Sequence, residues 1–356
     1  MTGVQTCALP IFAERLPELQ SNFRILITSR LENNIEVFFT KASKLSFQIK
    51  YMNDSDLAVK TDDDIQTYIK EKLPSDIFSQ YGDKLVKKAE GLFQWAAVAC
   101  GYICNPPPGL TKNDCILGLL KLSADHEELG QELGLLNDLY KQVLEGYFQS
   151  SIVRCRFRSV MGQLLAAFEP LSIDCLTALR WYLGDRDDES VVAIVRHLGS
   201  LLSNVTSSDH TLPIVPLHTS FRDFLTNDKT SGAFYVDIDK AHHQLTHSCL
   251  GLMVHDLKFN ICNLESSYLP NSKVSDLKSR IDKHIPPALF YACRFWDDHL
   301  ERVCFEQDLL VKLRLLFEKK FLYWLEILSL TRVVDAATPA LLSLKAWLAS
   351  GDHMEV

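Results

Sequence analysis

The sequence predicts a mainly α-helical, multi-domain protein with a small remnant of a parallel α/β sheet near its N-terminus and one β-hairpin. Hydrophobic residues make up 47% of the 356 residues, against only 15 glycines and 13 prolines, a composition typical of a globular, helix-rich chain. Apolar residues recur three and four positions apart over most of the chain after residue 55. Residues 23–28 differ, because they form a mostly apolar β-prone run, typical of a strand buried on both faces of a parallel sheet.

Two segments precede the first helices. Residues 1–11, MTGVQTCALPI, share no pattern with the rest of the chain and look like a translated sequencing-library adapter, so we exclude them as an artefact. Residues 12–54 are expected to hold the sheet remnant. Helical patterns then define a first helical domain at residues 55–105, which Pro-Pro-Pro-Gly at 106–109 ends. Within it, residues 84–103 are predicted to form one helix.

The rest of the chain is divided by its patterns into three parts. Residues 106–150 are predicted to be linking helices, 151–230 a compact domain of helices and a hairpin, and 231–356 a helical arm. Three sets of residues are predicted to be core stripes: Leu92, Phe93 and Trp95; Leu245, Cys249, Leu252 and Met253; and Leu289, Ala292, Cys293, Trp296 and Leu300.

The compact domain carries local signals for its boundaries. Ser172 is expected to cap a helix at its start, and Gly184 to stop it. A further helix is predicted over residues 189–202. Two β-prone arms, 201–205 and 212–217, then flank the turn-rich Ser-Ser-Asp and predict a hairpin.

The sequence Leu-His-Thr-Ser-Phe-Arg-Asp-Phe-Leu follows the hairpin at residues 217–225. Ser220 and Asp223 have the spacing of a capping box, which predicts a helix beginning there. His218 lies just ahead of that helix, where backbone N–H groups favour an anion such as phosphate. A neutral imidazole can donate one hydrogen bond to a phosphate oxygen. The alternative interpretation is a histidine that is satisfied within a turn.

A second candidate contact is Arg30, in the sequence Thr28-Ser29-Arg30. It directly follows the strand at 23–28, so it would lie at the carboxyl end of a parallel strand, where open α/β sheets bind ligands. Its planar guanidinium matches phosphate oxygens. A surface arginine at a strand end is the alternative.

Both motifs resemble those of NACHT-type signalling NTPases, STAND-class members of the P-loop NTPase superfamily. Residues 291–296, Tyr-Ala-Cys-Arg-Phe-Trp, are similar to the helical region that follows the winged helix in fungal members. The resemblance implies that residues 12–54 are the end of a nucleotide-binding core and that 151–230 are a winged helix. It makes Thr28, Ser29 and Arg30 the sensor element and makes His218 a phosphate contact.

The resemblance also implies partners and a switch. Leu92 and Phe93 would lie near the adenine, with Phe93 where the family has a proline. The intact protein would bind ADP in a closed state and ATP with Mg²⁺ in an open, homo-oligomerising state, contacting its upstream half in cis and other proteins. Self/non-self recognition or programmed cell death is the implied kind of signalling.

Motifs for catalysis are missing from the sequence. It contains no Gly-x-x-x-x-Gly-Lys-[Ser/Thr] loop and no apolar run leading into paired acidic residues, so we expect no ATP hydrolysis and no bound cofactor for this fragment alone. A stand-alone helical protein-interaction module is the alternative function. A serine or cysteine hydrolase is a third, for which no local signature exists.

Charge and cysteine usage set further expectations. A net charge of −8 argues against nucleic acid or anionic lipid as partner, and the helix at 189–202 offers only Arg196 and His197 for DNA. Ten scattered cysteines without a CxxC pair, no apolar span and no signal peptide predict a soluble, cytoplasmic protein. His243 and His247, near Cys249, lack an H-E-x-x-H pattern, so we expect a solvated helix face and no metal ligands.

Overall fold

The computed structural model describes residues 55–122, 131–187, 189–266 and 268–352, so the predicted strand at 23–28 lies outside the described residues. Contacts divide the chain into two compact units, Met1–Lys60 and Thr61–Val356. The described residues are mainly helical, as predicted, whereas the sheet remnant, the winged helix and the finer domain boundaries stay predictions. Within the described part, every helix is too short or too polar to cross a bilayer.

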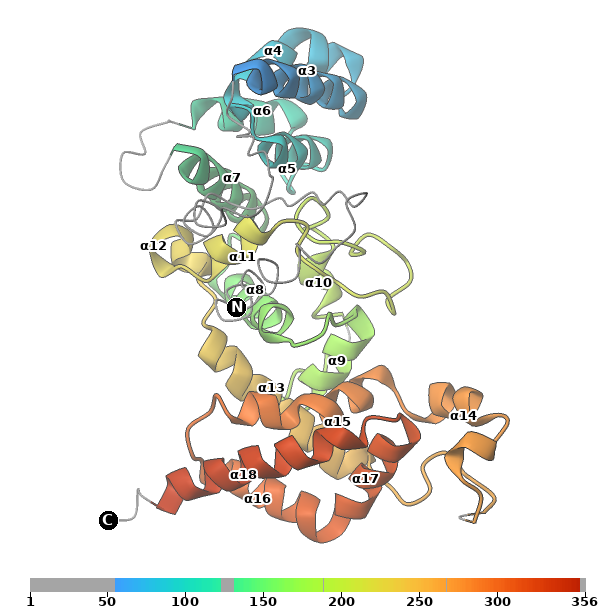
Figure 1. The fold of residues 1–356 in the computed structure, drawn as a ribbon. Helices are drawn as coiled ribbons and strands as arrows, with labels where there is room; N and C mark the ends of the chain where they lie inside the picture. The colour runs from blue at the N-terminus through green and yellow to red at the C-terminus, as the bar shows by residue number, and fades with distance from the viewer. Residues whose placement is uncertain (1–54, 123–130, 188, 267, 353–356) are drawn as a thin grey trace, which may run out of the picture. The chain divides into compact units, whose positions relative to one another are not determined.

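The first helices confirm the helical pattern but not its continuity. They are α3 (Ser55–Lys72), α4 (Ser75–Ala89), α5 (Phe93–Cys104), α6 (Lys112–Lys121) and α7 (Gln131–Tyr147) (Figure 1). The single helix predicted over 84–103 is wrong. Glu90 and Gly91 have φ angles of 48° and 77°, in the left-handed region that terminates a helix, so the chain turns between α4 and α5.

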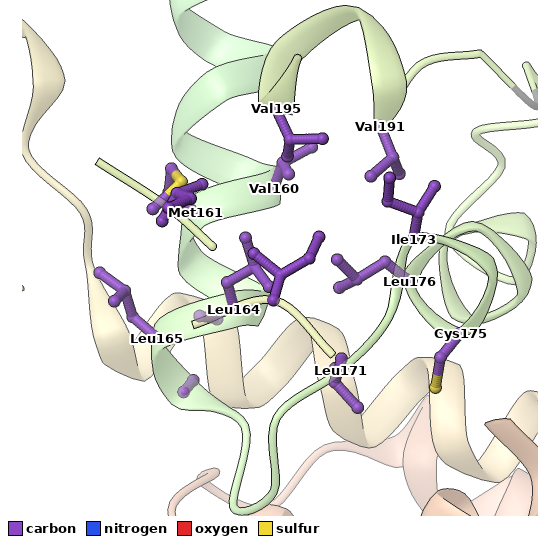
Figure 2. Packing of buried hydrophobic residues seen from close by; sticks show 14 of the residues in the cluster. Val160, Met161, Leu164, Leu165, Leu171, Ile173, Cys175, Leu176, Val191 and Val195 are labelled. Atoms are coloured by element: carbon purple, nitrogen blue, oxygen red, sulfur yellow. The ribbon is translucent and has the colours of Figure 1, made fainter. Parts of the chain in front are cut away.

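Short helices build the middle of the chain. They are α8 (Ser151–Ala166), α9 (Ile173–Trp181), α10 (Val192–Val195), α11 (Thr219–Leu225), α12 (Asp228–Ser231) and the 3-10 turn Gly232–Phe234. Ser172 caps α9 as predicted, because its hydroxyl accepts the N–H of Cys175 at 3.2 Å. Gly184, with a φ of 87°, follows the end of α9 as expected. Figure 2 shows side chains of α8 and α9 forming one core with Val191 and Val195.

Among the described residues, one isolated antiparallel bridge, between Leu202 and Pro216, joins the two predicted arms of the hairpin. A second antiparallel bridge pairs Pro213 of the second arm with Ser172, which lies outside the hairpin. The helix predicted over 189–202 is wrong, since only α10 is helical there. Leu201 accepts the backbone N–H of Leu217 at 2.9 Å, which holds this end of the segment in an extended pairing instead of a helix.

Longer helices complete the chain. They are α13 (Ile238–Asp256), α14 (Leu277–His284), α15 (Pro287–Leu300), α16 (Gln307–Leu315), the π-helix Leu316–Lys320, α17 (Phe321–Leu330) and α18 (Ala337–Asp352), with 3-10 turns at Asn271–Lys273 and Val334–Ala336. Helix α13 packs on α15 and α16 and also on α8 and α9. The stripes predicted on α13 and α15 are all buried, which confirms them. The nine cysteines in the described residues are free thiols.

Candidate functional site

His218 begins helix α11 and caps it with its own side chain. The ring nitrogen Nδ1 accepts the backbone N–H of Ser220 at 3.2 Å. The predicted capping box is therefore wrong, because the N-cap is His218 and Ser220 lies inside the helix, 3% exposed. Ser220 is not available at the helix start because its hydroxyl is turned into the protein. The imidazole takes over the role that a serine or asparagine more often has.

A buried tyrosine continues this contact into the core. The Tyr140 hydroxyl on α7 lies 2.7 Å from the Ser220 Oγ, which in turn lies 2.6 Å from the His218 Nδ1. The Tyr140 ring packs on Phe221 and Phe224, with centroids 5.2 and 5.5 Å away. Burial raises the pKa of the Tyr140 phenol, so the phenol stays protonated and can donate a hydrogen bond.

The order of these groups determines which ring nitrogen bears the proton. The backbone N–H of Ser220 donates to the Nδ1 of His218, so this nitrogen is an acceptor. The Ser220 hydroxyl can then donate to the same nitrogen, and the Tyr140 hydroxyl can donate to the Ser220 Oγ. With Nδ1 acting as an acceptor, the neutral ring carries its hydrogen on Nε2. His218 is exposed, so this N–H is borne by a ring at the protein surface. That tautomer is the one able to donate to a phosphate oxygen.

The other predicted contacts lie at the start of α5 or outside the described residues. Leu92 is half-buried at the N-cap of α5, and Phe93 is 43% exposed against the Tyr68 ring, at a centroid distance of 5.0 Å. The prediction that Phe93 belongs to the core is wrong, whereas Trp95 is fully buried as expected. Helix α5, which begins here, packs on α7, the helix that carries Tyr140.

Helix α7 therefore packs both on α5, which begins after Leu92, and on α11, which His218 caps. The starts of α5 and α11 hold the residues expected near the adenine and the phosphate, and these helices are far apart in sequence. Thr28, Ser29 and Arg30 lie outside the described residues. Of the predicted nucleotide contacts, the described ones lie on two helices, α5 and α11, that both pack on α7; that they bind nucleotide stays a prediction.

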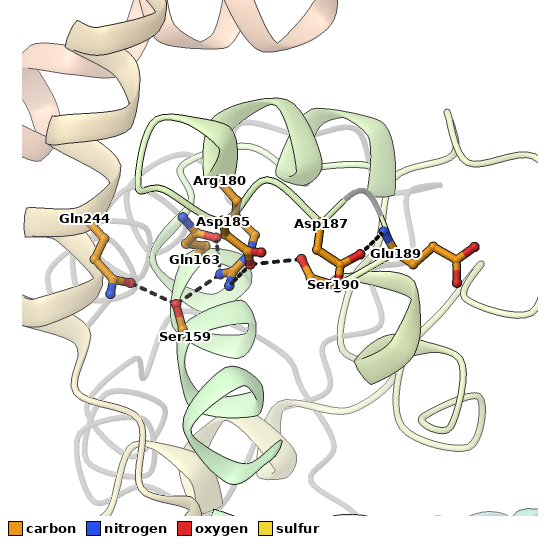
Figure 3. A network of polar contacts seen from close by, with 8 residues as sticks. All are labelled: Ser159, Gln163, Arg180, Asp185, Asp187, Glu189, Ser190 and Gln244. Carbon is orange, nitrogen blue, oxygen red and sulfur yellow. Dashed lines mark hydrogen bonds and ion pairs between the residues drawn. The ribbon is translucent and has the colours of Figure 1, made fainter. Parts of the chain in front are cut away.

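A second polar network lies in the same part of the chain and is structural (Figure 3). The Arg180 guanidinium, 5% exposed, contacts Asp185 Oδ2 through Nε at 3.0 Å and Nη2 at 2.7 Å. Its Nη1 donates to Ser159 and Gln163 on α8, and Ser190 donates to the same carboxylate. Burial alone would raise the pKa of Asp185, but the hydrogen bonds from Arg180 and Ser190 hold it below its ordinary value. Arg180 thus ties α9 to α8 and the following loop.

A groove of ≈ 750 Å³ lies between α9, α10 and α13. Acidic residues Asp174, Glu189 and Asp256 line it together with Arg196 and apolar side chains. It is open, and Leu92, Phe93 and His218, the described residues predicted to contact nucleotide, do not line it. Its mixed charges do not match a particular ligand.

One cluster was missed by the sequence reasoning. His243 and His247 on α13 both contact Glu306, which precedes α16. The expected solvated helix face is wrong for His247, whose side chain is 16% exposed. The acidic partner is 63 and 59 residues away in sequence, so no local spacing signals it.

Comparison with known proteins gives a distant match. The chain is 25% identical over 360 residues to vegetative incompatibility protein HET-E-1 of Podospora anserina. The alignment covers 92% of this chain and 25% of that protein, so the chain spans about a quarter of the length of the curated relative it matches. No protein-family model and no solved structure matches. The likeness is in keeping with the fungal signalling family named from the motifs.

Proposed function

We propose that this chain is part of a nucleotide-switched signalling protein of the fungal NACHT type, in which His218 contacts the phosphates of a bound nucleotide. The observation that carries the proposal is the anchored ring of His218, whose Nδ1 accepts from Ser220 so that Nε2 bears the hydrogen. The likeness to a vegetative incompatibility protein supports the same family.

In this proposal, different residues contact the phosphates and the adenine of the nucleotide. His218 donates from Nε2 to a phosphate oxygen, and Arg30, with Ser29 and Thr28 beside it, neutralises the terminal phosphate. The start of α5, at Leu92 and Phe93, would face the adenine. The cofactor class is ADP, or ATP with Mg²⁺, and binding energy shared between these segments holds the protein closed.

The chain's own sequence lacks the glycine-rich lysine loop, so in this proposal hydrolysis is not an activity of the fragment. The nucleotide-binding half of a longer protein is the partner in cis, and release of the closed state permits homo-oligomerisation and contact with other proteins. The cytoplasm is the proposed location.

The test uses the longer protein with its nucleotide-binding half and measures the ADP that co-purifies per mole of protein. His218→Asn is the informative variant, because asparagine also caps a helix but has no N–H where the imidazole Nε2 lies. We expect ADP affinity to fall by about 10- to 100-fold, since a hydrogen bond to a charged group contributes about 1.5–3 kcal/mol. The melting temperature of the apo protein should stay close to that of the wild type.

His210→Ala is the matched control, since His210 is a half-exposed histidine in the same part of the chain but outside the contacts of His218. It should leave bound ADP at the wild-type level. Full ADP retention in both His218→Asn and His218→Ala would contradict the proposal. A stand-alone helical interaction module would then be the better account of the chain.

A further inference from the structure

Helices α13 and α16 bring three metal-ligating side chains to one place. His243 and His247 are four residues apart on α13, so their rings lie on one face of that helix, with centroids 4.6 Å apart. Glu306 is the N-cap residue of α16, and its carboxylate makes no capping hydrogen bond. The carboxylate instead points at the two imidazoles.

The distances suit a shared cation. Glu306 Oε2 lies 2.7 Å from His243 Nε2 and 3.3 Å from His247 Nε2. One ligand atom from each residue lies within 4.8 Å of the other two. Ligands around a tetrahedral zinc ion with bonds of about 2.0–2.1 Å are about 3.3 Å apart. Small rotations of these side chains are therefore enough to place all three on one ion.

We propose that His243, His247 and Glu306 bind one divalent transition-metal ion of the zinc class, with water completing the coordination. Two imidazoles and a carboxylate are the donor set that such ions favour over calcium or magnesium. The side chains are 45%, 16% and 35% exposed, so an ion can enter from solvent while the helices fix the ligands.

Lys312 on α16 lies beside the proposed site, and its positive charge should weaken metal binding. Its Nζ lies 3.0 Å from the Nδ1 of His247 and 3.3 Å from the carbonyl oxygen of the same residue. When Nε2 binds a metal, the hydrogen of the neutral ring is on Nδ1, which then cannot accept from an ammonium group. Lys312 would keep only the carbonyl contact, and its positive charge opposes the cation.

An ion at this place would fasten the start of α16 to the middle of α13. These two helices are packed together already, and the ion would add a bond that the unfolded chain lacks. The site is independent of the proposed nucleotide contact at His218, because none of its three ligands lies on α5, α7 or α11.

The test is a titration of the untagged chain with ZnCl₂ against a chromophoric chelator, with Co²⁺ absorption spectra as a second readout. We expect one equivalent of zinc, visible cobalt bands of four-coordinate type and a higher melting temperature with zinc. His243→Ala and Glu306→Gln should each weaken binding by at least about 10-fold. Both side chains are partly exposed, so the folded state should survive.

Two further variants make the result specific. His255→Ala, on the same helix and beside Asp256, is the matched control and should bind zinc as the wild type does. Lys312→Met should bind zinc several-fold more tightly, because a positive charge has been removed. Equal binding by wild type, His243→Ala and His255→Ala would overturn the site, as would weaker binding by Lys312→Met. No binding by the wild type would leave a hydrogen-bonded cluster and contradict the proposal.

Discussion

Among the residues that the structure describes, a hydrogen-bonded chain of tyrosine and histidine side chains lies at the surface and another is buried. The surface chain consists of Tyr140, Ser220 and His218, and its imidazole is exposed at the start of α11. The buried chain consists of Tyr291, His299 and His242, between α13 and α15. Both chains connect a tyrosine hydroxyl to an imidazole, so the comparison shows how burial changes the role of a histidine.

In the buried chain both ring nitrogens of His299 have a partner inside the protein. His299 Nε2 lies 2.8 Å from the Tyr291 hydroxyl, and its Nδ1 lies 2.8 Å from the Nδ1 of His242. Tyr291 also accepts the backbone N–H of Phe168 at 3.3 Å. Burial lowers the pKa of His299 to about 3 and that of His242 to about 4. These rings are neutral at physiological pH and stabilise the fold, whereas the imidazole of the surface chain is exposed and is the one that we propose contacts a phosphate.

The largest expected effect comes from breaking the buried chain. His299→Ala should lower the free energy of unfolding by about 4 kcal/mol, because it leaves a cavity and removes the partner of both His242 and Tyr291. Urea unfolding at pH 7, followed by circular dichroism, measures the change. The His243 side chain is half-exposed, so His243→Ala should lower the free energy of unfolding by less than about 1 kcal/mol in metal-free buffer. Equal losses of unfolding free energy in the two variants would mean that burial does not determine how much a histidine stabilises this fold.

Acid should act on the buried chain through the depressed pKa of its imidazoles. Between about pH 4 and pH 6.5 the unfolded state binds protons that the folded state does not, so stability falls as the pH falls through this window. His242→Gln removes one of these groups. Relative to this variant, the wild type should lose roughly 2 kcal/mol between pH 7 and pH 5. Asp297 titrates in both proteins, so its contribution cancels in this comparison. A difference in free energy of unfolding that stays constant with pH would contradict a buried, neutral His242.

Asp297 on α15 should give the opposite pH dependence of stability, although it is buried in the same part of the protein. Burial, aided by Asp298, raises its pKa to about 7, and the side chain is 6% exposed. The folded state binds the extra proton here, so stability falls as the pH rises from about 4 through 7. Asp297→Asn should match the wild type near pH 4 and exceed it by roughly 4 kcal/mol at pH 8, because each unit of pKa shift corresponds to about 1.4 kcal/mol. A stability difference that does not grow with pH would contradict this assignment.

The smallest expected effect belongs to the surface chain. His218→Ala should lower the free energy of unfolding by about 1 kcal/mol, because the first turn of α11 loses its cap. His218→Asn should restore most of it, since asparagine accepts the same backbone N–H. Chemical denaturation of the three proteins side by side measures this. Equal losses in both variants would show that His218 stabilises α11 by some contact other than the cap.

Much of the helical fold could be predicted, because apolar stripes on α13 and α15 repeat regularly and are buried as expected. The break between α4 and α5 could not, since the helical spacing continues across Glu90, whose left-handed conformation is unusual for glutamate. The false helix over 189–202 arose because Leu198, Leu201 and Leu202 fit helical spacing although the last two residues lie where the chain pairs with the hairpin's second arm.

The candidate site was predicted in part. The position of His218 ahead of a helix was readable, but its role as the cap was not, since Ser220 is the stronger capping type and tertiary contact with Tyr140 decides otherwise. The partnership of His243 and His247 with Glu306 required the packing of α13 on α16, which no local pattern contains.

The most direct test is to record which ring nitrogen of His218 bears the hydrogen in the whole chain. Nitrogen NMR of selectively labelled histidine, with His218→Asn to assign the signal, distinguishes the two tautomers. We predict a neutral ring with hydrogen on Nε2 and a non-protonated Nδ1, and a shift of this population in Tyr140→Phe. A ring protonated on Nδ1, or an even mixture unaffected by Tyr140→Phe, would contradict the surface chain and the phosphate contact built on it.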